Sequence, residues 1–141
     1  DILLLLARVP LKDAAPVQLR FQAFTDDGKG AVSAEGAGFR IERPLASVSA
    51  AVHGTGPVTA AAGRLALPAE EGVFPYAEIT SARATEHTLL TVATTAPRGE
   101  RHGSLAVSAQ NGAWTVTGQH RGRTVRILLA LDAAGRPAIT V

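Results

Sequence analysis

Arginine and histidine side chains suited to binding an anion gather in two short segments of the chain. They are Arg98, Arg101 and His102 in RGERHG, and His120, Arg121 and Arg123 in HRGR. Guanidinium groups bind carboxylates and sulfates through paired N–H donors. Both segments are predicted loops that border the same strands, so together they would form a positively charged rim suited to uronate or sulfate groups. The alternative interpretation is that both are ordinary solvated turns.

Two aromatic residues, Tyr76 and Trp114, are the candidates for stacking on a sugar ring. Residues two apart in a strand share a face. Trp114 shares its face with Val116, which favours a place in the core. Tyr76 shares its face with Glu78 and Thr80, a polar set that predicts an outward side. Tyr76 is therefore the better candidate for a ligand contact, and equally for a contact with another subunit or domain.

Residues for metal binding or catalysis do not fall into a recognisable motif. The four histidines form no HxH or HExxH pair and are expected in loops and on outer strand faces: His53, His87, His102 and His120. The chain has no GxSxG elbow, and its glycine-rich segments lack the GK[ST] ending of a phosphate-binding loop. Nothing singles out a pair for glycoside hydrolysis among the central glutamates, which are Glu70, Glu71, Glu78 and Glu86. We therefore assign no catalytic residue, no metal ligand and no cofactor.

The composition indicates a folded domain rather than a disordered chain. Of 141 residues, 46% are hydrophobic and 18% are charged. The apolar residues are mostly Ala, Val and Leu, with only six aromatics, which suits two thin sheets packed face to face. A net charge of +2 with only two lysines is weak for a nucleic-acid module, so we expect no nucleic-acid partner. Residues 2–7 are apolar but too few to span a membrane, and no membrane partner is expected.

Residues 74–97 form the segment around which the fold is predicted to be organised. They contain two predicted strands, 76–81 and 88–95, joined by a charged turn around Arg83 and Glu86. Residues 1–9 (DILLLLARV) form a continuous apolar run, typical of a strand covered on both faces. Residues 16–24 alternate between apolar and polar, as in a half-buried strand. Asn111-Gly112 is a strong hairpin signal.

Further strands are predicted at 31–43, with a glycine interruption at Gly36 and Gly38, and at 46–53, 58–62, 64–67, 104–110, 113–119, 124–131 and 137–141. Short strands separated by turn residues, without an amphipathic helix, predict an all-β fold. We expect an antiparallel, jelly-roll-like β-sandwich of about eleven short strands that forms a single domain over residues 1–141. Because the chain begins at Asp1 and contains no methionine, we also expect it to be part of a longer parent chain.

The order of these segments resembles the C-terminal β-sandwich region of heparinase II/III-like polysaccharide lyases. DILLLLARV followed by PVQLRFQAF is similar to that family's strand carrying DRV and the alternating strand after it. AGFRIERPLASVSAAV resembles the next segment, a buried glycine before an alternating strand, and FPYAEITSARATEHTLLTVATTA resembles PYVEVTSA…FLTVLTP. The likeness covers most of the chain and departs at Ala7, where the family often has Asp.

The resemblance implies a parent enzyme with a helical toroid followed by β-sandwich layers. In such lyases Tyr and His abstract the C5 proton of a uronate, and β-elimination breaks the 4-linked glycosidic bond. Those residues belong largely to the toroid and the first part of the sandwich region, so no catalytic residue is carried onto this chain. The expectation is a non-catalytic portion that supports the catalytic module and contacts an acidic polysaccharide, in a secreted or periplasmic bacterial protein. Two alternatives stay open: a free-standing carbohydrate-binding or adhesive module, and a self-assembling structural subunit.

Overall fold

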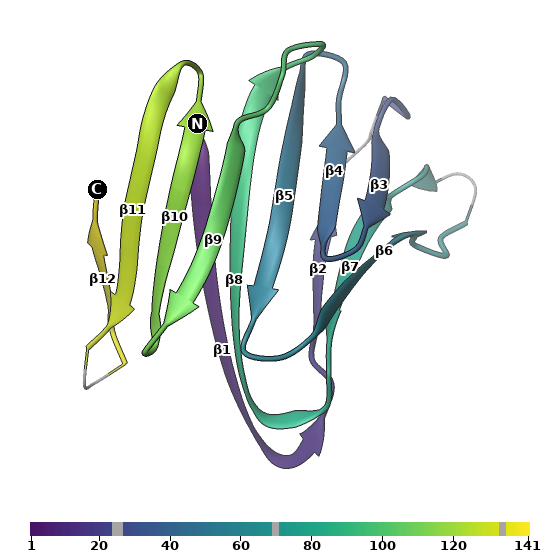
Figure 1. Cartoon of the computed structure of the whole chain (residues 1–141). Helices are drawn as coiled ribbons and strands as arrows, with labels where there is room; N and C mark the ends of the chain where they lie inside the picture. The colour runs from purple at the N-terminus through teal and green to yellow at the C-terminus, as the bar shows by residue number, and fades with distance from the viewer. Residues whose placement is uncertain (24–26, 69–70, 133–134) are drawn as a thin grey trace. The chain divides into compact units, whose positions relative to one another are not determined.

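The structure is a computed structural model that describes residues 1–23, 27–68, 71–132 and 135–141. Over these residues it has twelve β-strands and no α-helix (Figure 1). Every strand pairing is antiparallel, so the predicted all-β antiparallel fold is confirmed. Phe24 and Glu70, which entered the sequence analysis, lie outside the described residues. The chain divides into two compact units, Asp1–Glu100 and Arg101–Val141, and the single domain predicted over residues 1–141 stays a prediction.

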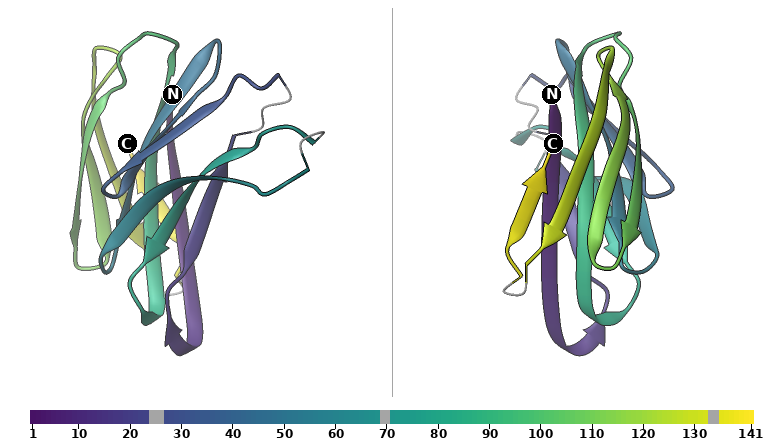
Figure 2. Two further views of the ribbon diagram at one scale, coloured as in Figure 1. Left: turned by 90° about the vertical axis from the view of Figure 1, so that its right-hand side faces the viewer. Right: turned by 60° about the vertical axis from the view of Figure 1, so that its left-hand side comes forward.

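The first unit contains two sheets that lie face to face (Figure 2). The larger sheet has the order β1-β8-β5-β4-β3. Its strands are β1 (Ile2–Ala15), β8 (Ala84–Pro97), β5 (Ala46–Gly54), β4 (Gly38–Glu42) and β3 (Ala31–Glu35). The smaller sheet has the order β2-β7-β6. Its strands are β2 (Gln18–Gln22), β7 (Pro75–Ser81) and β6 (Val58–Arg64).

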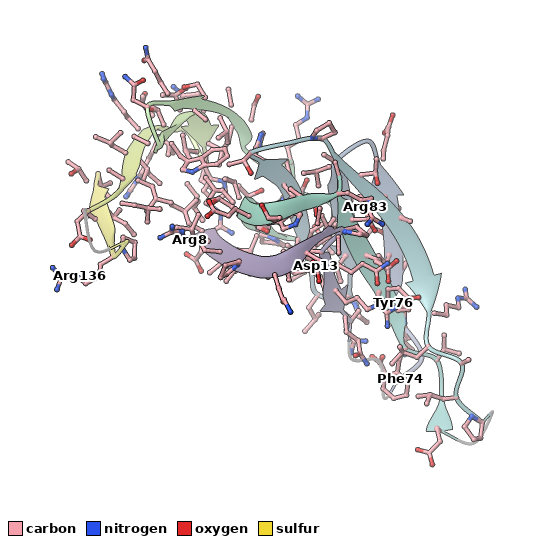
Figure 3. The ribbon with its side chains drawn as sticks, turned by 90° about the horizontal axis from the view of Figure 1, so that it is seen from below. Arg8, Asp13, Phe74, Tyr76, Arg83 and Arg136 are labelled. Atoms are coloured by element: carbon pink, nitrogen blue, oxygen red, sulfur yellow. The ribbon has the colours of Figure 1, made fainter. Side chains whose placement is uncertain are left out.

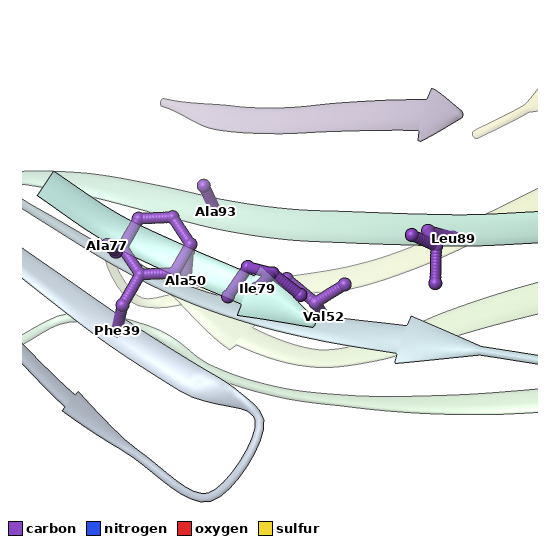
Figure 4. Close-up of a cluster of buried hydrophobic side chains, with 7 residues drawn as sticks. All are labelled: Phe39, Ala50, Val52, Ala77, Ile79, Leu89 and Ala93. Atoms are coloured by element: carbon purple, nitrogen blue, oxygen red, sulfur yellow. The ribbon is translucent and has the colours of Figure 1, made fainter. Parts of the chain in front are cut away.

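A core of mostly small aliphatic side chains fills the space between these two sheets (Figure 4). Its buried members are Phe39, Ala50, Val52, Ala77, Ile79, Leu89 and Ala93. Phe21 adds a ring from β2 that stacks on Phe39 with 4.7 Å between the ring centroids. The β3 and β6 edges are joined by a backbone hydrogen bond of 2.7 Å, from Ala60 N–H to Gly36 O. The expected pairing of two thin sheets through Ala, Val and Leu is thus what this unit contains.

Strand β1 differs from its prediction, because it is an edge strand and is not covered on both faces. Its only pairing partner among the described strands is β8. Leu3 and Leu5, on the face that carries Ala7 toward the core, are 62% and 45% exposed. The most buried strand of the sheet is instead its neighbour β8, which lies between β1 and β5 and is buried at every residue from 89 to 94. A continuous apolar run shows that a strand forms but does not distinguish an edge strand from a central one.

Two further predicted strands have different boundaries in the structure. The interrupted strand predicted over residues 31–43 is a hairpin of β3 and β4, and the predicted glycine interruption is its turn at Gly36, with φ of 58°. The strands predicted over 58–62 and 64–67 are one strand, β6, which passes through Gly63 without a break. Both differences have one cause: glycine interrupts a strand only where the backbone needs a positive φ, and Gly63 does not have one.

The second unit is one four-stranded sheet with the order β12-β11-β10-β9. Its strands are β9 (Ser104–Gln110), β10 (Ala113–His120), β11 (Arg123–Leu131) and β12 (Pro137–Thr140). The predicted Asn111-Gly112 turn is confirmed, with φ of 51° and 76°. Arg121-Gly122 makes the same kind of turn, with φ of 50° and 73°. Two successive positive φ values match the twist of a two-residue hairpin loop, so both turns fix the register of β10.

Candidate glycan-contact surfaces

The end of the second unit at the β10–β11 turn brings together two basic segments that are distant in sequence. β10 ends at His120, the turn follows, and β11 begins at Arg123. Ser104 at the start of β9 pairs with Gln119, so the segment 101–103 reaches the same end of the sheet. A Cβ atom on Gly103 would lie 2.6 Å from Gln119 O and 2.8 Å from His120 Nδ1. The backbone therefore passes this close to β10 only because residue 103 is glycine.

Three arginines are exposed at this end, and we call Arg101, Arg121 and Arg123 the basic end. None of them forms an ion pair with another described residue of the chain. Arg126 is also exposed and lies further along β11, opposite Thr117. These guanidinium groups therefore present N–H donors to solvent, where a carboxylate or sulfate can reach them.

The charge of the chain is concentrated in the second unit. Residues 101–141 contain five arginines and one acidic residue, Asp132, which gives a net charge of +4. Asp132 follows β11 at the strand end opposite Arg123. Its Oδ2 is 2.8 Å from Nε of Arg136. The only acidic side chain of the second unit thus lies away from the basic end, and the acidic residue next to the basic end in sequence is Glu100, directly before Arg101. The three arginines outnumber it, so the field at this end is positive and attracts an external anion.

The two histidines of the predicted rim are placed differently from its arginines. His120 is only 8% exposed, and burial, together with Arg121, lowers its pKa. His120 therefore adds little charge at neutral pH, and unlike the three arginines of the basic end it is not exposed to solvent. His102 is half-buried next to Arg101. Arg98 belongs to the first unit, where its side chain is exposed and its backbone N–H donates to Leu45 O at 3.0 Å.

Trp114 is 6% exposed and shares its face of the sheet with Val116, as the favoured interpretation of a core tryptophan requires. Leu129 is its cross-strand neighbour on β11 and is also buried. The indole ring has no open face on which a pyranose could stack. The burial of Trp114 agrees with the favoured interpretation of a core tryptophan, and its contact with a glycan stays a prediction.

Tyr76 lies on the outward face of the smaller sheet with Glu78 and Thr80, as predicted, and near Phe74 (Figure 3). The Arg20 guanidinium lies 4.9 Å from the centroid of its ring. A Cβ atom on Gly63, the cross-strand partner of Tyr76, would lie 2.6 Å from Cζ of the tyrosine. The ring thus rests on the bare backbone of Gly63 and has a cation above it, so less of its face is open than the sequence suggested.

The polar side chains around Tyr76 form an ion pair and a hydrogen bond with one another. Arg20 Nε lies 2.6 Å from Glu78 Oε2, and Gln18 Nε2 donates to Glu78 Oε1 at 3.0 Å. The hydrogen bond to Glu78 and its charge raise the pKa of Arg20, which stays protonated. Sequence reasoning did not identify Arg20 or Gly63, because the signal is a cross-strand pairing that only the register reveals. This face is a neutral hydrogen-bonding surface and a weaker anion site than the basic end.

One serine–histidine contact was not anticipated. Ser81 Oγ lies 3.0 Å from His87 Nδ1, and His87 is buried rather than placed in a loop or on an outer face as expected. His87 Nε2 lies 3.0 Å from Ala15 O and 3.1 Å from Ala84 O. Since carbonyl oxygens only accept, Nε2 carries the proton and Nδ1 accepts from Ser81. Ser81 Oγ also accepts a hydrogen bond from Val17 N–H at 2.9 Å. Both members of the pair thus form hydrogen bonds with backbone atoms, which indicates a structural role.

Among the described residues, no three histidine, cysteine or acidic side chains are grouped closely enough to hold a metal ion. The described part of the chain also contains no helix of the length and hydropathy that a membrane span needs. No protein-family model, curated protein or solved structure matches this chain.

Proposed function

We propose that this chain is a non-catalytic β-sandwich portion of a heparinase II/III-like lyase, and that it contacts a uronate-containing polysaccharide while supporting a catalytic module. The observation that carries the polysaccharide contact is the basic end, where Arg101, Arg121 and Arg123 are exposed without an acidic partner among the described residues. The order of strand segments in the sequence supports the kinship with lyases.

An acidic polysaccharide suits the basic end better than a nucleic acid does. The guanidinium fork matches a carboxylate in shape and charge, and successive uronates along a glycan offer one carboxylate after another. Nucleic-acid surfaces usually add aromatic side chains on which bases stack. The only tryptophan of the chain is buried, and the only tyrosine lies in the other unit beneath Arg20.

A non-catalytic role is supported by the surroundings of the groups that could act as a base. Elimination needs a base near the C5 proton and a cation or donor near the uronate carboxylate, both in one cleft. The ring of Tyr76 contacts Arg20 and Gly63, and both nitrogens of His87 are engaged within the fold. Neither group is presented to a substrate in the way that proton abstraction requires.

The proposal is tested by measuring binding to a polyuronate and to a neutral glucan by isothermal titration calorimetry. We expect the wild-type chain to bind the polyuronate and not the glucan. Arg121→Gln/Arg123→Gln should weaken binding about tenfold, since each of the two charge-assisted contacts is worth roughly 0.7 kcal/mol at an exposed site. Arg136→Gln, in the same unit but paired with Asp132, is the control and should bind as the wild type does. Equal binding by the double variant would refute the contact. Release of unsaturated uronate products by the chain alone would refute the non-catalytic role.

The exposed edge of β1 favours self-assembly as a second candidate function. Its N-terminal part carries Leu3 and Leu5 in the open and pairs only with β8. An apolar edge strand with unpaired backbone groups is a template for pairing with another chain. Light scattering over a range of protein concentrations tests this function. Growth to large oligomers would support self-assembly, and a monomer at the highest concentration would refute it.

A further inference from the structure

The larger sheet of the first unit carries a polar hollow of about 360 Å³. It is bounded by the β3–β4 hairpin and by the neighbouring strand β5. The side chains that matter for its chemistry are Ser33, Glu35, Arg40 and Ser49. We call it the Arg40 hollow, and its volume is at the lower end of the range for small-molecule sites.

The strand register places the polar residues of the hollow side by side. Ser33 on β3 pairs with Arg40 on β4, and Arg40 pairs with Ser49 on β5. Directly paired residues share a face of the sheet, with Cβ atoms about 5 Å apart. This face is opposite the one on which Phe39 enters the core. The sheet therefore presents a guanidinium with a hydroxyl on either side of it.

The depth of the hollow comes from Gly38, which precedes Arg40 by two residues and lies on the same face. It pairs with Glu35 on β3 and with Ala51 on β5. Because Gly38 has no side chain and Ala51 has only a methyl group, the surface is low at this point. The carboxylate-bearing side chain of Glu35 is exposed at the rim of the depression.

The guanidinium of Arg40 is held by one nitrogen. Its buried Nε lies 2.8 Å from Glu42 Oε1, in an ion pair that is not aligned as a hydrogen bond. Its side chain is still 43% exposed. The two Nη nitrogens have no partner among the described residues, and neither do the side chains of Ser33, Ser49 and Glu35. These groups are oriented by the sheet and keep free donors and acceptors. Because Glu42 balances the charge of Arg40, the hollow would hold a carboxylate through the geometry of the Nη donors and not through an excess of positive charge.

We propose that the Arg40 hollow binds a single sugar acid, with the sugar carboxylate on the Nη nitrogens of Arg40 and ring hydroxyls on Ser33, Ser49 and Glu35. A guanidinium fork takes a carboxylate in a bidentate manner, and serine hydroxyls and a carboxylate take sugar hydroxyls as donors and acceptors. The class of ligand rests on the proposed function, whereas the site lies in the first unit and is separate in sequence from the basic end.

The test is a titration of the whole chain with sodium glucuronate, followed by amide chemical shifts, with glucose as the ligand that lacks the carboxylate. We expect millimolar affinity for glucuronate, at least tenfold weaker binding of glucose, and shifts centred on Ser33, Gly38, Arg40 and Ser49. Shifts centred elsewhere, or equal affinity for the two sugars, would overturn the proposal.

Two variants separate the charge of the site from its shape. Arg40→Gln removes the carboxylate partner and should weaken glucuronate binding at least tenfold. Gly38→Ala puts a methyl group into the hollow, where its nearest neighbours would be Ala50 O at 3.2 Å and Glu35 O at 3.4 Å, so the strand can accept it with a small shift. It should also weaken binding, and it keeps the proposal testable if Arg40→Gln does not fold. Wild-type affinity in Gly38→Ala would overturn the assignment.

A third variant distinguishes this site from the basic end. Arg121→Gln/Arg123→Gln should bind glucuronate as the wild type does while it loses affinity for the polyuronate. If the double variant instead loses its affinity for glucuronate while Arg40→Gln keeps it, glucuronate does not bind in the Arg40 hollow, and the proposed function is unaffected. If Arg40→Gln loses its affinity for glucuronate but no basic-end variant changes polyuronate binding, the assignment of the Arg40 hollow is supported and the proposed function is refuted.

Discussion

Ser81 and His87 join the two sheets of the first unit at the corner where the chain passes from β7 to β8, with Ser81 Oγ 3.0 Å from His87 Nδ1. β7 belongs to the smaller sheet and β8 to the larger one, so these consecutive strands do not pair with each other. The chain passes between the same two sheets from β1 to β2, and His87 Nε2 reaches Ala15 O on that passage. Arg83 Nη2 donates to Ala14 O at 2.7 Å beside it. The buried imidazole of His87 thus forms hydrogen bonds at both places where the chain passes from one sheet to the other, between β7 and β8 and between β1 and β2.

Removing this imidazole should destabilise the fold. His87→Ala leaves two carbonyl oxygens without their ring N–H donor, and the Ser81 hydroxyl then has only Val17 O, at 3.4 Å, as an acceptor. Each buried polar group left unsatisfied costs roughly 1–3 kcal/mol. We expect the free energy of unfolding in urea to fall by at least about 2 kcal/mol. Thr85→Ala, at an exposed position of the same strand, is the control and should change it by less than about 0.5 kcal/mol. An unchanged urea midpoint in His87→Ala would contradict this role.

The packing of Tyr76 on Gly63 predicts that a side chain at residue 63 would push the tyrosine ring away. A Cβ atom at residue 63 would overlap the tyrosine ring, so Gly63→Ala must displace the ring from beneath Arg20. We expect a loss of about 1 kcal/mol, at the low end of the cost of overpacking, because the added atom meets the outer end of a half-buried side chain and not backbone. Gly56→Ala is the matched control, since nothing lies within 4 Å of the added atom. Thermal unfolding that is equal in the two variants would contradict the contact.

Leucines of the same strand pair should differ strongly in their contribution to stability. Leu89 is 2% exposed on the inner strand β8, and Leu5 is 45% exposed on the edge strand β1. We expect Leu89→Ala to cost about 2–5 kcal/mol and Leu5→Ala less than about 1 kcal/mol. Equal costs in denaturant titrations would mean that β1 is covered on both faces, as its sequence alone suggests.

Acidification should destabilise the chain below neutral pH. Burial lowers the pKa of His53, and burial together with Arg121 lowers that of His120. In the unfolded chain both histidines keep a pKa of about 6.5. Below that pH the unfolded state binds more protons than the folded state, so stability falls as the pH drops, and above it these residues contribute no pH dependence.

The check is the urea midpoint at pH 7.5 and at pH 5.5, which should be lower at the acidic pH. The variant His53→Gln/His120→Gln should show a smaller difference. Asp27 does not affect this range, because the backbone N–H of Lys29, assisted by Arg43, lowers the pKa of its carboxyl group further below its ordinary value of 3.8. A midpoint that rises on acidification would contradict the assignment of the two histidines.

Much of the strand content follows from local pattern, and the relations between strands do not. Alternation placed Tyr76 outward and Trp114 inward, and Asn111-Gly112 set a hairpin, because these depend on side-chain period and on φ. Whether β1 is an edge strand or an inner strand depends on how many strands pair with it, and its own residues do not determine that number.

The sites depend on register in the same way. Arg40 stands between Ser33 and Ser49 because three strands pair as they do, and Gly103 lies against His120 through the pairing of β9 with β10. The sequence analysis did predict that the basic segments border the same strands. It did not predict that Asp132, the one acidic residue of the second unit, lies at the far end of β11 and is paired there with Arg136.

The central claim, that the basic end contacts an acidic polysaccharide, is tested most directly by the salt dependence of polyuronate binding. Exposed charge contacts are screened as ionic strength rises. We predict that wild-type affinity falls steeply between about 20 and 200 mM salt, where the Debye length shrinks from about 20 to 7 Å. Arg121→Gln/Arg123→Gln should show a weaker affinity and a shallower fall, and Arg136→Gln should follow the wild type. Identical salt dependence in the wild type and the double variant would contradict the account.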